Sequence, residues 1–191
     1  MREGELSIVT RLQRADESVG AQLLWITLFA AATALAARIE IPAWPVPFTL
    51  QTMVVLLAGA FLGVRNGAAS QVLYLAVGLA GLPVFSSGGF GLAKLVGPTG
   101  GYLAAFPIAA AVVGLLVAGR RELPRVILGM ASGSLVILLL GVAHLYSFYV
   151  RDLATALQGG LVAFGLWDAV KAGAAAMIYR EVAKRWPRLP A

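Results

Sequence analysis

The feature that most constrains this chain is a series of long apolar stretches separated by prolines, glycines and charged residues. They occupy residues 22–38, 49–63, 66–82, 100–119, 126–149 and 159–179. A helix needs about 20 mostly apolar residues to cross a bilayer. Only 13% of the residues are charged and 60% are hydrophobic, too few charges for the surface of a soluble domain. The sequence therefore predicts an all-α membrane protein, a bundle of six transmembrane helices.

The chain divides into three predicted parts. Residues 1–20 mix acidic and basic side chains with an apolar stripe, which predicts a cytoplasmic interfacial segment. Residues 21–182 form the six-helix bundle, and residues 183–191 form a cytoplasmic tail. A cleaved signal peptide ending near residues 34–36 is the alternative, but the acidic residues before it are atypical of a signal's basic leader.

The fifteen Lys and Arg residues are unevenly distributed. Eleven lie in the amino-terminal segment, the gap after the second stretch, the gap after the fourth stretch and the residues after 179, whereas the other three gaps hold one each. Cytoplasmic loops carry an excess of basic residues. Both termini are therefore predicted to be cytoplasmic, and the two long Pro- and Gly-rich loops to be outside.

Two ionisable residues, Asp168 and Lys171, lie inside the last apolar stretch. Asp168 is expected about 15 Å below the outer surface, near the middle of the hydrocarbon core. The i, i+3 spacing puts both side chains on one helical face, where they can pair. A buried pair costs free energy that apolar residues would not, so it indicates a substrate or ion site, with a purely structural ion pair as the alternative.

The outer loops carry the remaining polar candidates. The loop over residues 82–102 is too apolar for a solvated linker and too rich in glycine for a helix, so we expect it to cover the mouth of the bundle as a lid. Thr99 can cap the next helix, whose free N–H groups could receive an anion, although an ordinary helix start is the better interpretation. Gln51 lies in the same half of the membrane as this loop. These groups predict a pocket open to the outside.

Several functions are excluded. There is no cysteine and a single histidine, His144, which we expect in the outer aromatic belt, so no metal site is predicted. No GxxxxGK[ST] motif occurs, so the chain has no ATPase activity of its own. The positions of the basic residues are explained by membrane topology, so the positive net charge does not indicate nucleic-acid binding. An Asp–Lys pair without a nucleophile or metal cluster argues against an enzyme.

Small residues recur every fourth position in the first apolar stretch. Ala30 with Ala34, and Ala32 with Ala36, form ridges that let another helix approach closely in lipid. These ridges therefore predict a close contact with a helix outside the bundle. Packing within the same bundle is an equally supported alternative.

The outer-loop motifs, together and in this order, resemble the BioY family, the biotin-specific substrate-binding (S) components of energy-coupling factor (ECF) transporters. The resemblance runs from about residue 28 to residue 179. Its motifs are Ile41-Pro42, Val46-Pro47-Phe48-Thr49-Leu50-Gln51-Thr52, Leu82-Pro83-Val84-Phe85 with Gly88 and Gly89, and Gly97-Pro98-Thr99-Gly100-Gly101-Tyr102.

The resemblance implies a non-enzymatic S component in a bacterial-type cytoplasmic membrane, which captures biotin from outside without a cofactor. It implies a partner module of two ABC ATPases and a transmembrane coupling protein, and docking through the alanine ridge. The chain departs from the family at Trp167 and Lys94, where relatives have a smaller residue and no such charge.

Biotin fits these residues chemically. Asp168 can accept a ureido N–H and Lys171 can donate to the ureido carbonyl. Trp44, Phe85, Phe90 or Trp167 can cover the apolar atoms. Lys94, Arg38 or the amides after Thr99 are candidates for the carboxylate. The predicted substrate-binding residues are Asp168, Lys171, Gln51, Trp44, Phe85, Gly88, Gly89, Thr99 and Tyr102. An ion-coupled vitamin or small-molecule carrier that works alone, with Asp168 as coupling group, remains the alternative.

Overall fold

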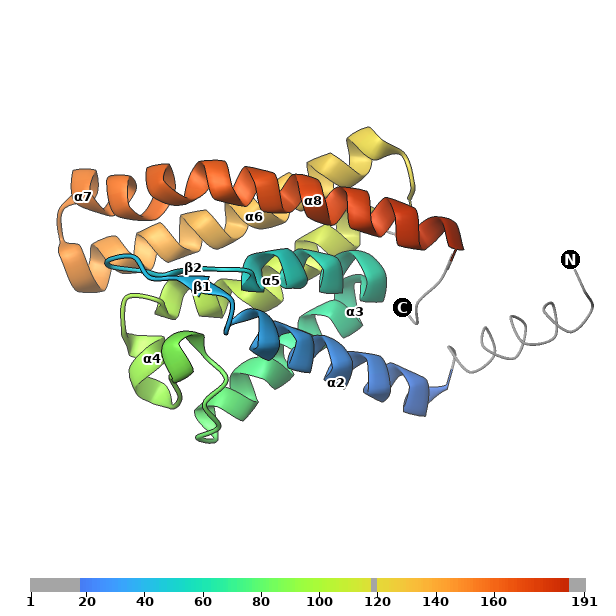
Figure 1. Ribbon diagram of the computed structural model, residues 1–191, viewed down its shortest axis with the longest axis horizontal. Helices are drawn as coiled ribbons and strands as arrows, with labels where there is room; N and C mark the ends of the chain where they lie inside the picture. Colours follow the sequence, from blue (N-terminus) through green and yellow to red (C-terminus); the bar gives the residue numbers. More distant parts are fainter. Residues whose placement is uncertain (1–17, 118–119, 186–191) are drawn as a thin grey trace, which may run out of the picture.

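The computed structural model describes residues 18–117 and 120–185, most of which are helical (Figure 1). The helices are α2 Val19–Ala36, α3 Gln51–Leu79, α4 Leu92–Val96, α5 Gly100–Val117, α6 Leu123–Leu145, α7 Leu153–Leu157 and α8 Ala163–Arg185. A 3-10 turn, η1, covers Ser86–Gly88, and two π-helical segments, η2 and η3, cover Tyr146–Val150 and Gln158–Val162. Strands β1 Glu40–Ile41 and β2 Phe48–Thr49 pair antiparallel.

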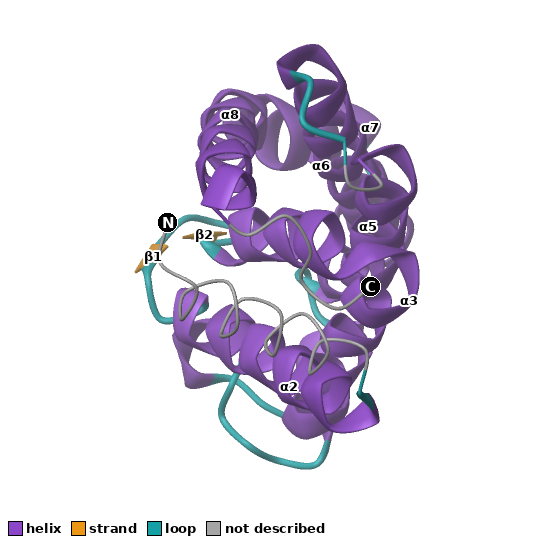
Figure 2. Ribbon diagram, turned by 90° about the vertical axis from the view of Figure 1, so that its right-hand side faces the viewer, coloured by secondary structure: helices purple, strands orange, loops and turns teal. Residues whose placement is uncertain are grey.

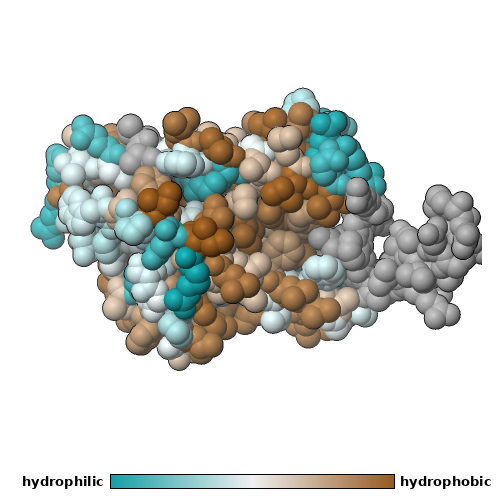
Figure 3. Space-filling view, viewed as in Figure 1, coloured by the Kyte–Doolittle hydropathy of each residue, from teal (hydrophilic) through white to brown (hydrophobic). Residues whose placement is uncertain are grey.

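Five helical runs in the described part are long and apolar enough to cross a membrane. They are Val19–Ala36, Gln51–Leu79, Gly100–Val117, Leu123–Val150 and Leu153–Lys184. Large apolar side chains such as Leu135 and Leu139 of α6 remain exposed on the outside of the bundle, where they can meet lipid chains. Hydrophobic residues cover the middle of the face in Figure 3, and hydrophilic residues gather toward its two ends. The predicted helical membrane bundle is confirmed at this level.

The helix α3 is a hairpin rather than one straight rod. Gly63 breaks it with a backbone φ of 74° that favours glycine. The amide of Gln51 donates a hydrogen bond to the hydroxyl of Tyr74, 23 residues later, whereas a continuous helix would separate these residues by about 35 Å. The segments on either side of Gly63 therefore lie antiparallel. The break lies next to residues 64–65, which separate the second and third apolar stretches of the sequence.

The elements are arranged so that the two ends of the bundle differ. The start of α2 and the end of α8 lie at one end, while the β-hairpin, α4 and α7 lie at the other (Figure 1). The hairpin lies between α2 and α8 (Figure 2). The loops predicted to be outside therefore gather at the end of the bundle opposite to the start of α2 and the end of α8. At that end they can form a site.

Two predicted segments fall largely outside the described residues. The interfacial segment over 1–20 is described only from residue 18, where the hydroxyl of Ser18 caps α2 by accepting from the amide of Ala21 at 3.1 Å. The tail predicted from residue 183 begins inside a helix, since α8 continues to Arg185.

Candidate functional site

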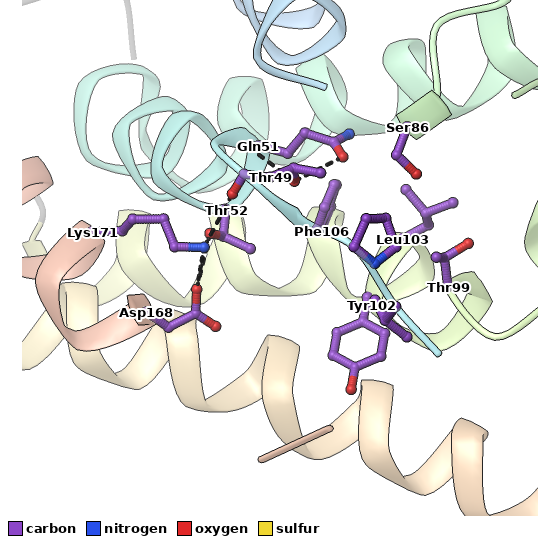
Figure 4. A pocket seen from close by; sticks show the side chains of 12 residues that line it. Thr49, Gln51, Thr52, Ser86, Thr99, Tyr102, Leu103, Phe106, Asp168 and Lys171 are labelled. Carbon is purple, nitrogen blue, oxygen red and sulfur yellow. Dashed lines mark hydrogen bonds and ion pairs between the residues drawn. The ribbon is translucent and has the colours of Figure 1, made fainter. Parts of the chain in front are cut away.

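A buried ion pair on α8 forms the base of the site (Figure 4). The Nζ atom of Lys171 lies 2.5 Å from Oδ1 of Asp168. Asp168 is only 2% exposed, so its charge is almost fully removed from solvent. The hydroxyl of Thr52, on the first turn of α3, donates to the same Oδ1 at 3.2 Å. Lys171 also donates to the backbone oxygen of Thr49 at 3.1 Å. The two predicted charges therefore pair, and they tie α8 to β2 and α3.

A chain of neutral hydrogen bonds continues from this pair toward the loop after α3. The hydroxyl of Thr49 donates to Oε1 of Gln51 at 3.1 Å. The Nε2 of Gln51 donates to the hydroxyl of Tyr74, which in turn donates to the carbonyl of Val84 at 3.3 Å. Gln51 and Tyr74 are both buried. Because their polar atoms satisfy one another, this chain can persist in an apolar environment.

These side chains surround an inner cavity of about 40 Å³. Its lining residues come from the β-hairpin, α3, the outer loops, α5 and α8: Val46, Pro47, Thr49, Gln51, Thr52, Ser86, Thr99, Tyr102, Leu103, Phe106, Asp168 and Lys171. Sites for small organic molecules commonly measure about 300–1,000 Å³. The inner cavity therefore has room for little more than a water molecule. An organic ligand can enter it only if the loops above it move apart.

A larger outer cavity of about 540 Å³ lies above the inner one. It is lined by Pro42, Ala43, Pro45, Pro47, Ser87, Gly89, Phe90, Ala93, Lys94, Gly97, Pro98, Thr99 and Tyr149. Pro47 and Thr99 line both cavities. The two spaces are therefore adjacent at these residues, which belong to the β-hairpin connection and to the segment that follows α4.

The two outer loops are fastened to each other. The carboxylate of Glu40 accepts from the backbone N–H of Ser87 at 2.9 Å and from its hydroxyl at 3.0 Å. The guanidinium of Arg38 donates to the carbonyl of Pro83. These bonds hold the loop after α3 against the β-hairpin, in the position predicted for a lid.

Five of the nine predicted substrate-binding residues line the inner cavity: Asp168, Lys171, Gln51, Thr99 and Tyr102. The pairing of the first two follows from their spacing on one helix. Gln51, Thr99 and Tyr102 come from other segments. Their predicted place in the outer half of the membrane or in the outer loop indicated that they could contribute to the site.

The other four predicted residues lie elsewhere. Trp44 is 80% exposed. Phe85 is completely buried beneath the outer loop, with its ring edge-on to Tyr74 at a centroid distance of 5.4 Å. Gly89 lines the outer cavity, and Gly88 lies beside Arg38. The structure therefore gives Phe85 a role in anchoring the loop, not in lining the inner cavity.

Sequence reasoning missed several lining residues. Ser86 and Val46 neighbour predicted positions, but Leu103 and Phe106 lie on α5, which is apolar throughout. On such a helix, no periodicity distinguishes a side chain that faces a cavity from one that faces lipid. Their proximity to Tyr102 on the same helix was the available signal.

His144 supports the site from α6. Its Nε2 lies 3.0 Å from the carbonyl oxygen of Gly97, and its ring packs on Phe148 at a centroid distance of 5.0 Å. Gly97 precedes Thr99 in the segment where the two cavities are adjacent. No group of three or more metal-ligating side chains occurs within residues 18–117 and 120–185.

The alanine ridges of α2 face the bundle more than the outside. Ala30 and Ala36 are each 6% exposed, and Ala32 and Ala34 are half-buried. Ala30 belongs to the main core cluster, and Ala34 packs against it. Among the predicted alternatives, this geometry favours packing within the bundle, and docking through these residues stays an untested prediction.

Comparison with known proteins gives consistent matches. Residues 10–188 match the model of the BioY family. A biotin transporter BioY from Thermotoga maritima is 39% identical over 163 residues, which are 85% of this chain and 96% of that protein. A probable biotin transporter BioY from Pyrococcus horikoshii is 40% identical over 153 residues, 80% of this chain and 90% of that protein.

One solved structure also matches. It is the crystal structure of the S-component for biotin from an ECF-type ABC transporter. The TM-score is 0.78 at 29% sequence identity, over 85% of this chain and 90% of that one.

Proposed function

The chain belongs to the BioY family, and from this premise we propose that it is the biotin-binding S component of an ECF-type vitamin transporter. It captures biotin from outside the cell and passes it to the inside with the help of an ATP-driven partner. The relatives compared with it are transporters, and the proposed function of the chain is transport without catalysis.

The buried Asp168–Lys171 pair beside the inner cavity is the observation that carries this proposal. The ureido ring of biotin has two N–H donors and one carbonyl acceptor. Asp168 can accept an N–H, and Lys171 can donate to the carbonyl. In the present structure the two side chains satisfy each other. Bound biotin would therefore replace the Asp168–Lys171 contact with hydrogen bonds from its ureido ring to both side chains. Neither buried charge would then be left without a partner.

The energy for active uptake must come from a partner protein or from an ion gradient. The sequence contains no nucleotide-binding motif, and the structurally similar protein is a component of an ABC transporter. We propose that the partner is an energising module of two cytoplasmic ABC ATPases and a transmembrane coupling protein. An ion-coupled carrier would need no such module.

The proposed topology has six crossings and cytoplasmic termini in a bacterial-type cytoplasmic membrane. When the two arms of α3 are counted separately, the number of long helical segments is even. An even number of crossings puts the start of α2 and the end of α8 on the same side of the membrane, which agrees with their positions in Figure 1. The bias of basic residues supports an inner location for that side.

Calorimetry on the purified full-length protein tests the binding function. We expect saturable binding of biotin at one site and no heat with thiamine or riboflavin, whose rings present different donors and acceptors. Absence of biotin binding by folded protein would refute the proposal. Uptake into vesicles then tests the partner: uptake driven by an ion gradient without any ATPase module would instead support the carrier.

A further inference from the structure

The outer cavity contains one cationic side chain among the residues that line it. Prolines and Phe90 provide an apolar wall, and Lys94 provides the charge. A cavity of about 540 Å³ that combines an apolar wall with one cation is suited to an alkyl chain that ends in an anion. The inner cavity below it is suited to a polar ring.

Lys94 is held along the loop rather than extended freely into solvent. A Cβ atom built on Gly89 would lie 2.1 Å from Cε of Lys94, 2.8 Å from Cγ and 2.9 Å from Cδ. The lysine stem therefore lies directly on the bare backbone of Gly89, a position that a larger residue would obstruct. This contact places the lysine side chain beside residue 89, which also lines the outer cavity.

Of the other two candidates for an anion, Arg38 lines neither cavity, and the amides after Thr99 carry no formal charge. The guanidinium of Arg38 donates to the carbonyl of Pro83. The first amide after Thr99, that of Gly100, donates to the carbonyl of Gly97 at 3.0 Å. By contrast, the ammonium of Lys94 makes no hydrogen bond or ion pair with any residue in the described ranges 18–117 and 120–185. Lys94 is therefore the cation among these three candidates that lines a cavity.

We propose that Lys94 binds the carboxylate of the substrate while Asp168 and Lys171 bind its ring. This inference rests on the proposed function, and it extends the site from the inner cavity into the outer one. The valeryl chain would pass between Pro47 and Thr99, which line both spaces. Lys94 thereby contributes to specificity for a ligand with an anionic tail.

The test compares biotin with biotinol, in which a neutral alcohol replaces the carboxylate. Their dissociation constants are measured on the wild type, Lys94→Met and Lys94→Arg, with melting temperature as the check on folding. Lys94→Met should weaken biotin binding roughly tenfold, the size of one lost charge-assisted hydrogen bond, and leave biotinol binding unchanged. Lys94→Arg keeps the positive charge and should restore most of the preference for biotin.

Other outcomes overturn the inference. Equal loss for both ligands in Lys94→Met would make the lysine a structural support, and no loss for either would remove it from the site. Selective loss of biotin in Arg38→Met, with Lys94→Met unaffected, would move the carboxylate to Arg38. If the wild type binds neither ligand, the proposed function itself fails, whereas equal affinity for the two ligands refutes only carboxylate recognition.

Discussion

The ammonium of Lys171 lies 3.1 Å from the carbonyl oxygen of Thr49, although 122 residues separate them. The same ammonium lies 2.5 Å from Asp168. A helix and a two-residue strand from opposite ends of the chain are therefore joined through one buried charge. This junction ties α8 to β2, and it presents polar groups to a ligand at the same point.

Breaking the buried pair should impair binding. Asp168→Asn and Lys171→Met are each expected to weaken biotin binding by about 2–5 kcal/mol, since each leaves a desolvated polar group without its partner. Calorimetry measures the change. The control is Lys184→Met on the same helix, because Lys184 makes an ion pair with Glu181 at the same spacing but with exposed side chains, and such pairs contribute little. Native affinity in both folded site variants would refute the site.

Bound biotin should protect the outer loop. Residues 84–96 include Ser86 of the inner cavity and Lys94 of the outer cavity, so a ligand that fills both holds the loop in place. Hydrogen exchange over this segment is expected to slow when biotin is added, while exchange in α6 stays the same. Identical exchange with and without biotin would exclude a lid.

The fastening of the two outer loops can be tested without ligand. Glu40→Ala removes both bonds to Ser87, and we expect faster exchange of the Ser87 amide and a faster rate of biotin dissociation. Glu122→Ala provides the control, because it removes an acidic side chain of the same kind just before α6, where Glu122 makes an exposed ion pair with Arg125. Unchanged exchange at Ser87 would mean that other contacts, such as the Arg38–Pro83 hydrogen bond and the buried Phe85, hold the loop.

His144 is expected to act by positioning the segment between Gly97 and Thr99. His144→Phe keeps an aromatic ring on Phe148 but loses the contact with the Gly97 carbonyl. Biotin binding should weaken by about 1 kcal/mol, the net contribution of one hydrogen bond. His144→Gln, which retains a donor, should recover part of this loss. Full affinity in His144→Phe would show that packing alone positions the segment.

Adjacent alanines on α2 distinguish a core position from a lipid-facing one. Ala30→Trp places an indole inside the core cluster and should lower the melting temperature, because overpacking destabilises a filled core. Ala31→Trp introduces the same side chain at an exposed position and should leave stability and biotin binding near those of the wild type. A stable Ala30→Trp variant would instead favour the docking ridge.

Features that depend on neighbours along the chain were predictable from sequence. The apolar stretches gave the helices, and the i, i+3 spacing gave the pairing of Asp168 with Lys171, because a helix fixes which residues share a face. The break in α3 was also predictable, since Gly63 and the charged Arg65 interrupt an apolar run. In each case the determining interaction is local.

Contacts between segments were decided by the tertiary structure. Lipid and protein interior are both apolar, so hydropathy does not fix the rotation of a membrane helix about its axis. For this reason the sequence could not reveal that Ala30 faces the core. Phe85 and Trp44 lie in loops, where no helical or strand period indicates which side chain is buried, so the burial of Phe85 and the exposure of Trp44 were not predictable either. The sequence by itself determined the helices and the charged pair. Only the packing of those helices decided that Thr49 and Thr52 would complete the pair's hydrogen bonds.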